Sequence, residues 1–382
     1  MHIENCFPIG FENNDETEGS SISKIEKSIV QTILSQKHWG EEIPLSWYKF
    51  EAFLSKEKEE NKILSPQELF KRFQSNVENY ISPNIDEMEQ VDILQFFHEI
   101  GRILFFQEDN LRDYVILDVQ WFVDAFKHVI TDCNHMPVVN RPREWDEFNS
   151  TGVLHHTVLE EIWRYADCRG ILKYKDVILP YMQRLGLLVI GEESHLIPSV
   201  TKREYKEEMS MLSTTDQKTL ILYFSFDFLP LFVYHRLVVS CFSFKDWLPL
   251  QDGYKCIYKN VSEFKYEHHY IVLGVFKEDI YLQIYRPNMQ NAVLNKNVTL
   301  KVRQTVEDEL EKLSNSYHRK IKFETGFYCM TKENSDRCFI PESEMRILTS
   351  EICPHHESRP NHTIISKEYM WPWDKTVQKP AP

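Results

Sequence analysis

The stretch DYVILDVQWFVDAFKHVI, residues 113–130, joins a short apolar run directly to a segment with helical spacing. Residues 114–117 predict a buried strand. Asp118 is suited to cap the following helix, because its carboxylate can accept hydrogen bonds from the N–H groups of the first turn. Apolar side chains recur every three or four residues from Val119 onward and predict one buried helix face. A capped helix start holds Trp121 in a fixed direction, which serves a core and an interaction surface alike.

Three amphipathic helices are predicted before this stretch. Apolar residues at helical spacing mark residues 44–54, 65–73 and 93–104. The second of these begins with Ser65-Pro66-Gln67-Glu68, which is the pattern of a capping box with proline in the first helical position.

After this stretch the sequence predicts two more helices and then two strands around a turn. The helices are expected over residues 157–165 and 175–185, and the strands over 187–190 and 195–197. Because helix, strand, helix, helix and hairpin follow one another in winged-helix domains, we expect residues 39–212 to form a helical, winged-helix-like domain.

A winged helix raises the question of nucleic-acid binding. A DNA-binding wing needs Lys or Arg for phosphate contacts, whereas this predicted hairpin carries Glu192 and Glu193. The sign of the charge therefore favours a protein-contact fold, and we expect no nucleic-acid partner.

Beyond residue 213 the pattern changes to alternating apolar and polar residues, which is typical of strands with one buried face. A helix over residues 302–317 carries an apolar stripe that would cover one face of a sheet. The chain is therefore expected to be of the α+β class. Its mostly antiparallel sheet, within residues 213–350, is predicted from strands 220–226, 236–244, 254–258, 270–276 and 280–285.

The two ends of the chain differ from the middle. Residues 6–9 predict a strand, and isoleucines within residues 22–33 mark one apolar helix face. One strand and one helix cannot bury that face between them, so they are expected to be the edge of a larger α/β unit. Residues 351–382 are rich in Pro, His and Trp, are poorly patterned, and are expected to form a tail.

Composition limits the possible functions. The chain has 382 residues, a formal net charge of −14 and no basic patch, so its field repels phosphate backbones and anionic lipid surfaces. Its eight cysteines are scattered and no secretory signal follows Met1, which favours a reducing compartment and a cytoplasmic location. No apolar run is long enough to cross a bilayer, so no transmembrane segment is expected.

The sequence carries no recognisable catalytic motif. No glycine is followed by lysine, as the phosphate-binding loop of GTPases requires, and the three closely spaced glycines of dinucleotide-binding folds are absent. Scattered carboxylates are expected on the surface of an acidic protein and define no acid/base pair. We therefore expect no catalytic residue and no cofactor within this chain.

One group of residues has the composition of a metal site. Zinc sites usually contain a tight Cys-x2-4-Cys or His-x3-5-His pair, whereas the first two cysteines of this group are nine residues apart. The spacing favours thiols and surface histidines without a metal, and structural zinc is the alternative. The group consists of Cys329, Cys338, Cys353, His355, His356 and His362.

The ordered set of motifs resembles a known family. ILQFFHEIGRILFFQEDNLRDYVILDVQWFVDAF, residues 93–126, is similar to the COR domain of Roco proteins, which join a Ras-like GTPase domain called Roc to COR. Trp145 with residues 151–154, and residues 182–188 with 196–199, also resemble COR elements. CFPIGFENND followed by the isoleucine-striped helix and WGEEIPLSW is similar to the end of Roc running into COR.

The resemblance implies a division of the chain into four parts. Residues 1–38 would be the C-terminal remnant of Roc, with the GTPase motifs lying upstream. Residues 39–212 would be the helical COR-A half, which packs on Roc in the family. Residues 213–350 would be COR-B, which mediates dimerisation, and residues 351–382 would be the tail.

The resemblance also implies a non-catalytic function. The chain would couple a Roc domain to homodimerisation through COR-B and to signalling, with GTP expected only where an upstream Roc domain is present. A fragment of an active GTPase is one alternative, and GTP turnover by the chain would distinguish it. A winged-helix interaction scaffold is another.

Six residues are the interface candidates. The segment 228–237 matches a family element with a glycine where this chain has Phe232. For Val115 and Trp121, plain core packing is the alternative, because tryptophan is highly buried on average wherever it occurs. The candidates are Val115, Trp121, Phe122, Pro230, Arg236 and Leu237.

Overall fold

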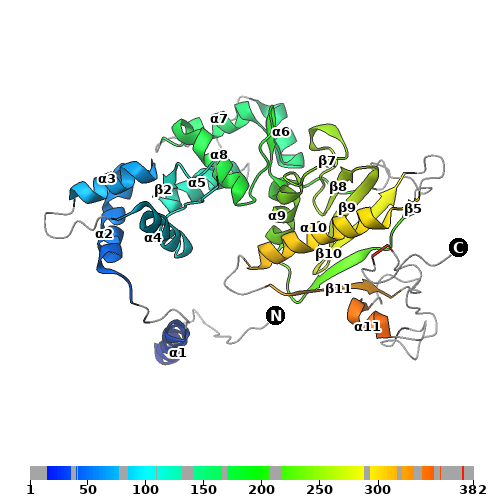
Figure 1. The fold of residues 1–382 in the computed structure, drawn as a ribbon, viewed down its shortest axis with the longest axis horizontal. Helices are drawn as coiled ribbons and strands as arrows, with labels where there is room; N and C mark the ends of the chain where they lie inside the picture. The colour runs from blue at the N-terminus through cyan, green and yellow to red at the C-terminus, as the bar shows by residue number, and fades with distance from the viewer. Residues whose placement is uncertain are drawn as a thin grey trace. The chain divides into compact units, whose positions relative to one another are not determined.

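The computed structural model divides the chain into two compact units, Met1–Trp121 and Phe122–Pro382 (Figure 1). Each unit is considered separately below. The residues that the structure describes are 15–35, 40, 42–76, 85–108, 110–130, 141–165, 170–206, 217–287, 293–315, 321–329, 338–347, 353 and 372–373.

The first unit is mostly helical. Its short strands pair antiparallel, with Ile63 opposite Ile116 and Leu64 opposite Val115. The phenylalanines of three helices meet in its core, where the Phe50 ring lies 5.1 Å from Phe70 and 5.0 Å from Phe73. The elements are α1 (Asp15–Leu34), α2 (Leu45–Glu60), β1 (Ile63–Leu64), α3 (Pro66–Asn76), α4 (Glu87–Glu99) and β2 (Val115–Ile116), and α5 (Val119–Ile130) begins at its end.

Local capping fixes where α3 begins. The Ser65 Oγ accepts a hydrogen bond of 3.2 Å from the Glu68 N–H, as the capping-box pattern predicts. The Glu68 carboxylate in turn pairs with Arg72 at 2.8 Å, one helical turn further on. The predicted start of this helix is confirmed.

The second unit begins with a helical part. β3 and β4 pair antiparallel with Val153 opposite Leu196, and Val189 joins Leu196 as a single bridge. The Trp163 indole N–H donates to the Ala125 carbonyl at 3.0 Å and ties α7 to α5. The elements are α6 (Pro142–Thr151), β3 (Val153–His155), α7 (His156–Tyr165), η2 (Leu172–Tyr174), α8 (Lys175–Arg184), β4 (Ser194–Leu196) and η3 (Pro198–Val200).

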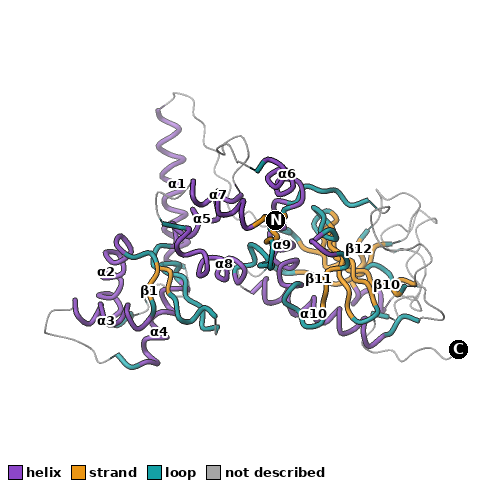
Figure 2. The backbone as a smooth tube through the Cα atoms, turned by 90° about the horizontal axis from the view of Figure 1, so that it is seen from above, coloured by secondary structure: helices purple, strands orange, loops and turns teal. Residues whose placement is uncertain are grey.

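The remainder of this unit contains an eight-stranded antiparallel sheet in the order β12-β11-β6-β10-β9-β8-β7, with β5 pairing β10. Figure 2 shows the sheet in orange, with β10, β11 and β12 labelled. The expectation of a mixed helix and antiparallel-sheet fold is confirmed. The strands are β5 (Gln217–Lys218), β6 (Leu222–Phe226), β7 (Trp247–Pro249), β8 (Val261–Tyr266), β9 (His269–Phe276), β10 (Asp279–Arg286), β11 (Phe323–Tyr328) and β12 (Phe339–Pro341).

Helices complete the core of the sheet. The apolar stripe of α10 (Lys296–Asn315) and the buried side of α9 (Leu231–Cys241) share one hydrophobic cluster with the strands. The predicted covering helix is thus present and starts six residues earlier than expected. A short helix, α11 (Glu342–Ile347), follows β12 directly.

Two strand predictions are wrong. Residues 236–244 were expected to be a strand, but residues 231–241 form α9, because the buried side chains Val233, Leu237 and Cys241 recur every fourth residue on one helix face. Residues 254–258 begin with the last residue of a 3-10 turn, η5 (Asp252–Tyr254), and contain a single bridge, from Ile257 to Ser262. The strand in this region is β8. The strand predicted over residues 6–9 lies outside the described residues.

Candidate functional site

Asp118 organises the join between β2 and α5. Its Oδ1 accepts a hydrogen bond of 3.0 Å from the Trp121 N–H, which confirms the predicted cap, and its Oδ2 pairs with the Lys62 Nζ at 2.8 Å. Burial raises the pKa of Asp118, but the hydrogen bonds from Lys62 and the Trp121 N–H together lower it by more, so the pKa lies below its ordinary value of 3.8. The ionised carboxylate therefore stabilises the helix start.

The three candidates around this cap are core residues. Val115 and Trp121 are both 0% exposed, and Phe122 is also buried. The Phe122 ring lies 6.4 Å from the Tyr181 ring on α8. These side chains can therefore influence an interaction only through the surface that they support, and their role at an interface stays a prediction.

The other three candidates lie on or beside α9. Pro230 precedes the helix and is half-buried, and Leu237 is fully buried. Arg236 packs over the turn after α8. A Cβ placed on Gly186, whose φ is +72°, would lie 2.8 Å from the Arg236 Cγ, so only glycine leaves room for this side chain.

A second arginine ties the end of the helical part to the sheet. The Arg203 Nη2 donates to the carbonyl oxygens of Ile257 at 2.8 Å and Tyr254 at 3.2 Å, and also to that of Lys255. Its guanidinium lies 4.6 Å from the centre of the Tyr258 ring. We call the contacts of Arg203 and of Arg236 with Gly186 the junction of the second unit. No sequence motif pointed to Arg203.

Large apolar side chains are exposed at the start of α9. Phe228 is 57% exposed, Leu231 45% and Phe232 46%. The loop that carries them is anchored by a 2.8 Å hydrogen bond from the Leu229 N–H to the Glu278 carboxylate. We call Phe228, Leu231 and Phe232 the α9 patch. It falls within the segment where sequence analysis placed Pro230, Arg236 and Leu237.

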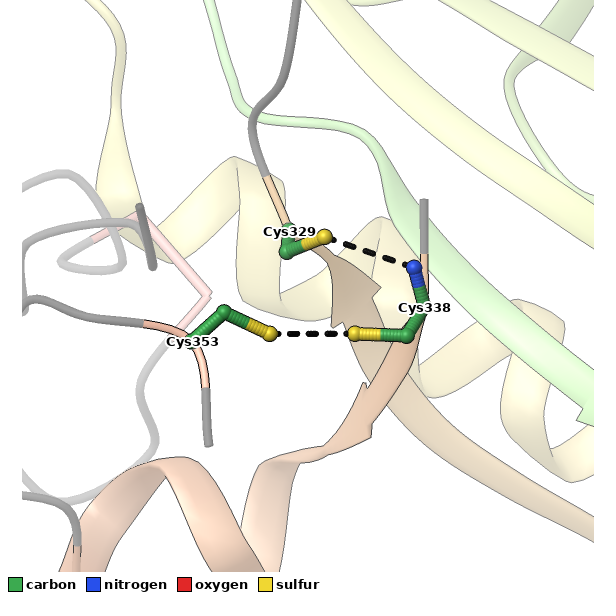
Figure 3. Close-up of side chains that lie close together, drawn as sticks. All are labelled: Cys329, Cys338 and Cys353. Atoms are coloured by element: carbon green, nitrogen blue, oxygen red, sulfur yellow. Dashed lines mark hydrogen bonds between the residues drawn. The ribbon is translucent and has the colours of Figure 1, made fainter. Parts of the chain in front are cut away.

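Three of the predicted metal-site residues come together. The Sγ atoms of Cys329, Cys338 and Cys353 all lie within 4.8 Å of one another (Figure 3). β11 and β12 pair with Tyr328 opposite Phe339, and the Cys329 N–H donates to the Cys338 carbonyl at 3.0 Å, so the strands bring the first two together. The three candidate histidines, His355, His356 and His362, lie outside the described residues.

The helical region has a family match. Residues 44–199 match the family model described as "C-terminal of Roc, COR-A domain". The chain carries a COR domain of the Roco family. The COR-A region contains Val115, Trp121 and Phe122, and it ends before Arg203 and the α9 patch. The description of the model places this domain C-terminal of Roc.

Two curated relatives from Dictyostelium discoideum are similar over part of the chain. "Probable serine/threonine-protein kinase pats1" is 27% identical over 149 residues, which are 39% of this chain and 4% of pats1. "Probable serine/threonine-protein kinase qkgA" is 29% identical over 124 residues, which are 32% of this chain and 6% of qkgA. The COR-bearing chain therefore spans only a small part of these relatives.

One solved structure is also similar. It is the "Structure of methanosarcina barkeri Roco2 RocCORdC bound to GDP", with 22% identity and a TM-score of 0.34 over 51% of this chain and 54% of that one. Within the described part of the COR chain, no helix meets the length and apolarity needed to span a membrane.

The Asp118 cap of the COR-A region can be tested by two substitutions. Asp118→Ala should lower the free energy of unfolding by about 1 kcal/mol or more, because it removes the cap and the Lys62 pair. Asp118→Asn keeps an acceptor for the Trp121 N–H and should lose less. Chemical denaturation of both variants measures this, and equal losses would contradict a capping role.

The same pair of proteins gives a pH test. A carboxylate whose folded pKa is depressed contributes stability above its unfolded pKa and loses it as the pH falls through the folded value. The stability difference between wild type and Asp118→Asn should therefore hold above about pH 4 and shrink below the ordinary value of 3.8. Denaturation curves of both proteins between pH 3 and 7 measure it, and a difference that grows on acidification would contradict it.

Proposed function

We propose that this chain is a non-catalytic, cytoplasmic module that couples a Roc-type GTPase domain to self-association and thereby to signalling. The COR-A region would receive the state of Roc, and the sheet would pair with a second copy. The α9 patch is the observation that carries the proposal, because it exposes three large apolar side chains in the half that pairs in the family. A twofold dimer would bring the same patch of two copies together.

The junction supports the coupling part of the proposal. Arg203 and Arg236 connect the helical part of the second unit to its sheet through backbone carbonyls and through close packing on Gly186. Such contacts leave little freedom for one part to move without the other. A displacement of the helices by a bound Roc domain would therefore also shift α9, where the α9 patch begins.

The helical part also supports a winged-helix-like arrangement devoted to protein contact. α5 contacts α7 through the Trp163–Ala125 hydrogen bond and α8 through the Phe122 and Tyr181 rings, and α7 directly follows β3 of the β3–β4 pair. The turn before β4 carries the exposed carboxylates of Glu192 and Glu193. Acidic groups at this position repel nucleic-acid phosphates and are compatible with a protein surface.

The exposed face of α1 supports the proposal that this helix is the end of a Roc domain. Such a face requires a partner, because isolated amphipathic helices draw most of their stability from packing. The rest of Roc would supply this partner. The exposed apolar side chains are Ile22, Ile29, Val30, Ile33 and Leu34.

Self-association can be tested at the α9 patch. We expect the wild-type chain to form a dimer, and Phe232→Glu to weaken it at least tenfold. Burying a phenylalanine contributes about 1.5–3 kcal/mol, and about 1.4 kcal/mol corresponds to a factor of ten in the dissociation constant. Sedimentation equilibrium over a range of concentrations measures both dissociation constants.

Leu248→Glu is the matched control, because Leu248 is an exposed apolar residue of β7 in the same unit but outside the patch. It should leave the dissociation constant unchanged. A wild-type chain that stays monomeric at high micromolar concentration would overturn the pairing part of the proposal. Equal effects of the two variants would assign the pairing to another surface.

Coupling needs a separate experiment. Titration calorimetry of the chain with a Roc-type GTPase domain, loaded with GDP or with a non-hydrolysable GTP analogue, should give different affinities for the two states. Replacement of Gly186 by Ala, which crowds Arg236, should reduce that difference. Equal affinities for the two nucleotide states would remove the coupling part of the proposal.

A further inference from the structure

We propose that Cys329, Cys338 and Cys353 bind a zinc ion as thiolate ligands. They come from three segments of the chain: the residue after β11, the residue before β12, and a position 15 residues beyond Cys338. Their three sulfur atoms nonetheless lie within 4.8 Å of one another, with side chains directed toward a common point (Figure 3). This site is independent of the proposed coupling to Roc.

The distances fit a tetrahedral zinc site. With Zn–S bonds of about 2.3 Å, the sulfur atoms of such a site are about 3.8 Å apart. The Cys338 and Cys353 sulfurs are 3.1 Å apart, and the largest separation in the group is below 4.8 Å. Every sulfur–sulfur separation is therefore within about 1 Å of the expected value, so small displacements would place all three around one ion.

The pairing of β11 with β12 supplies what a tight sequence motif usually supplies. In a Cys-x2-4-Cys motif, one turn holds two sulfurs close together. Here antiparallel strands hold Cys329 and Cys338 beside each other through a 3.0 Å backbone hydrogen bond. The nine-residue spacing therefore does not separate the two ligands in space.

The surroundings match those of a structural metal ligand set. Cys329 and Cys353 are buried in the hydrophobic cluster of the sheet, and Cys338 is half-buried. The Cys338 N–H donates to the Cys329 sulfur at 3.3 Å, a hydrogen bond of the kind that supports thiolate ligands. Three soft sulfur ligands select zinc over magnesium or calcium, which prefer oxygen.

Zinc would bind this cluster through deprotonated sulfurs, because a bound dication favours the thiolate form of a coordinating cysteine and displaces its proton.

Three thiolates leave one position of a four-coordinate ion for water or a further side chain.

The direct test is metal content and affinity. The 382-residue chain, purified under reducing conditions without chelator, should contain about one zinc per molecule by elemental analysis. Cys338→Ser should reduce zinc affinity at least tenfold in competition with a chromophoric chelator. Cys256→Ser is the matched control, since Cys256 is buried in the same hydrophobic cluster but is not one of the three grouped cysteines. This variant should retain the wild-type zinc affinity. A chelator should lower the Tm of the wild type by several degrees.

A spectroscopic test keeps the proposal open to refutation if a variant fails to fold. Wild-type apoprotein titrated with Co²⁺ should develop the charge-transfer absorption of cobalt–thiolate bonds together with tetrahedral d–d bands, and zinc should abolish both. Absence of these bands and of stoichiometric zinc would overturn the proposal. So would a metal-free native protein with a Cys338–Cys353 disulfide, detected as a mass lower by two hydrogen atoms.

Discussion

Replacing Arg303 by Met is expected to lower the free energy of unfolding of the second unit by about 3–5 kcal/mol. Arg303 lies on α10 with its side chain only 4% exposed. It pairs with Glu307 at 2.7 Å and with Glu342 at 2.6 Å. Its Nη1 also donates to the Trp373 carbonyl at 2.7 Å. Without the guanidinium, two buried carboxylates and a carbonyl lose a cation that water cannot replace.

The effect of Arg303→Met should depend on pH. In the wild type, burial lowers the pKa of Arg303, but Glu342 and Glu307 together raise it by more, so the guanidinium stays charged at all accessible pH values. In the variant, the buried carboxylates can relieve their repulsion only by taking up protons. The folded variant then binds more protons than its unfolded chain, so its stability relative to wild type should fall as the pH rises from about 5 to 8.

Urea denaturation at several pH values measures both effects. Lys312→Met is the matched control, because Lys312 lies on the same helix with a 74% exposed side chain and an ion pair to Glu309 of 3.4 Å. An exposed pair of this kind contributes at most about 1 kcal/mol. Adding Glu307→Gln and Glu342→Gln to Arg303→Met should recover part of the loss. A loss no larger than that of Lys312→Met would contradict the structural role of Arg303.

Local sequence signals correctly predicted where α3 and α5 begin. The Ser65 cap of α3 and the Asp118 cap of α5 each involve residues three positions apart, so they can be recognised from the sequence alone. The segment of α9 was predicted to be a strand, because Val238 and Val239 favour strands locally. The burial of Val233, Leu237 and Cys241 on one helix face decides the outcome.

The contacts that matter most for the candidate sites join residues that are far apart in sequence. Arg303 contacts Glu342, which lies 39 residues away along the chain, and Trp373, which lies 70 residues away. Arg203 contacts Ile257, which lies 54 residues away. Such partners leave no periodic pattern. Composition indicated the group of cysteines, but the nine-residue spacing between Cys329 and Cys338 did not match the Cys-x2-4-Cys motif of zinc sites, so a metal site was not favoured. The pairing of β11 with β12, which brings two of its members together, was not predicted.

Trp121→Ala is expected to destabilise the fold by about 3–5 kcal/mol, because a fully buried tryptophan leaves a large cavity when it is truncated. Val123→Ala on the exposed side of the same helix should change stability by less than about 0.5 kcal/mol. Denaturation monitored by far-UV circular dichroism compares the two variants. Trp121→Phe, which refills part of the cavity, should recover some of the loss.

The two interpretations of Trp121 differ in what its truncation would do to the binding of a Roc-type domain. If Trp121 is a core residue, Trp121→Ala lowers the stability of the fold first, and its effect on Roc binding should follow the fraction of folded protein. If Trp121 contacts Roc, the variant should keep the wild-type stability and bind Roc more weakly. Titration calorimetry of Trp121→Ala with a Roc-type GTPase domain, under conditions where the variant is folded, therefore separates them. Wild-type stability combined with weakened Roc binding would contradict the core assignment, because a side chain that is 0% exposed cannot touch a partner unless the structure opens around it.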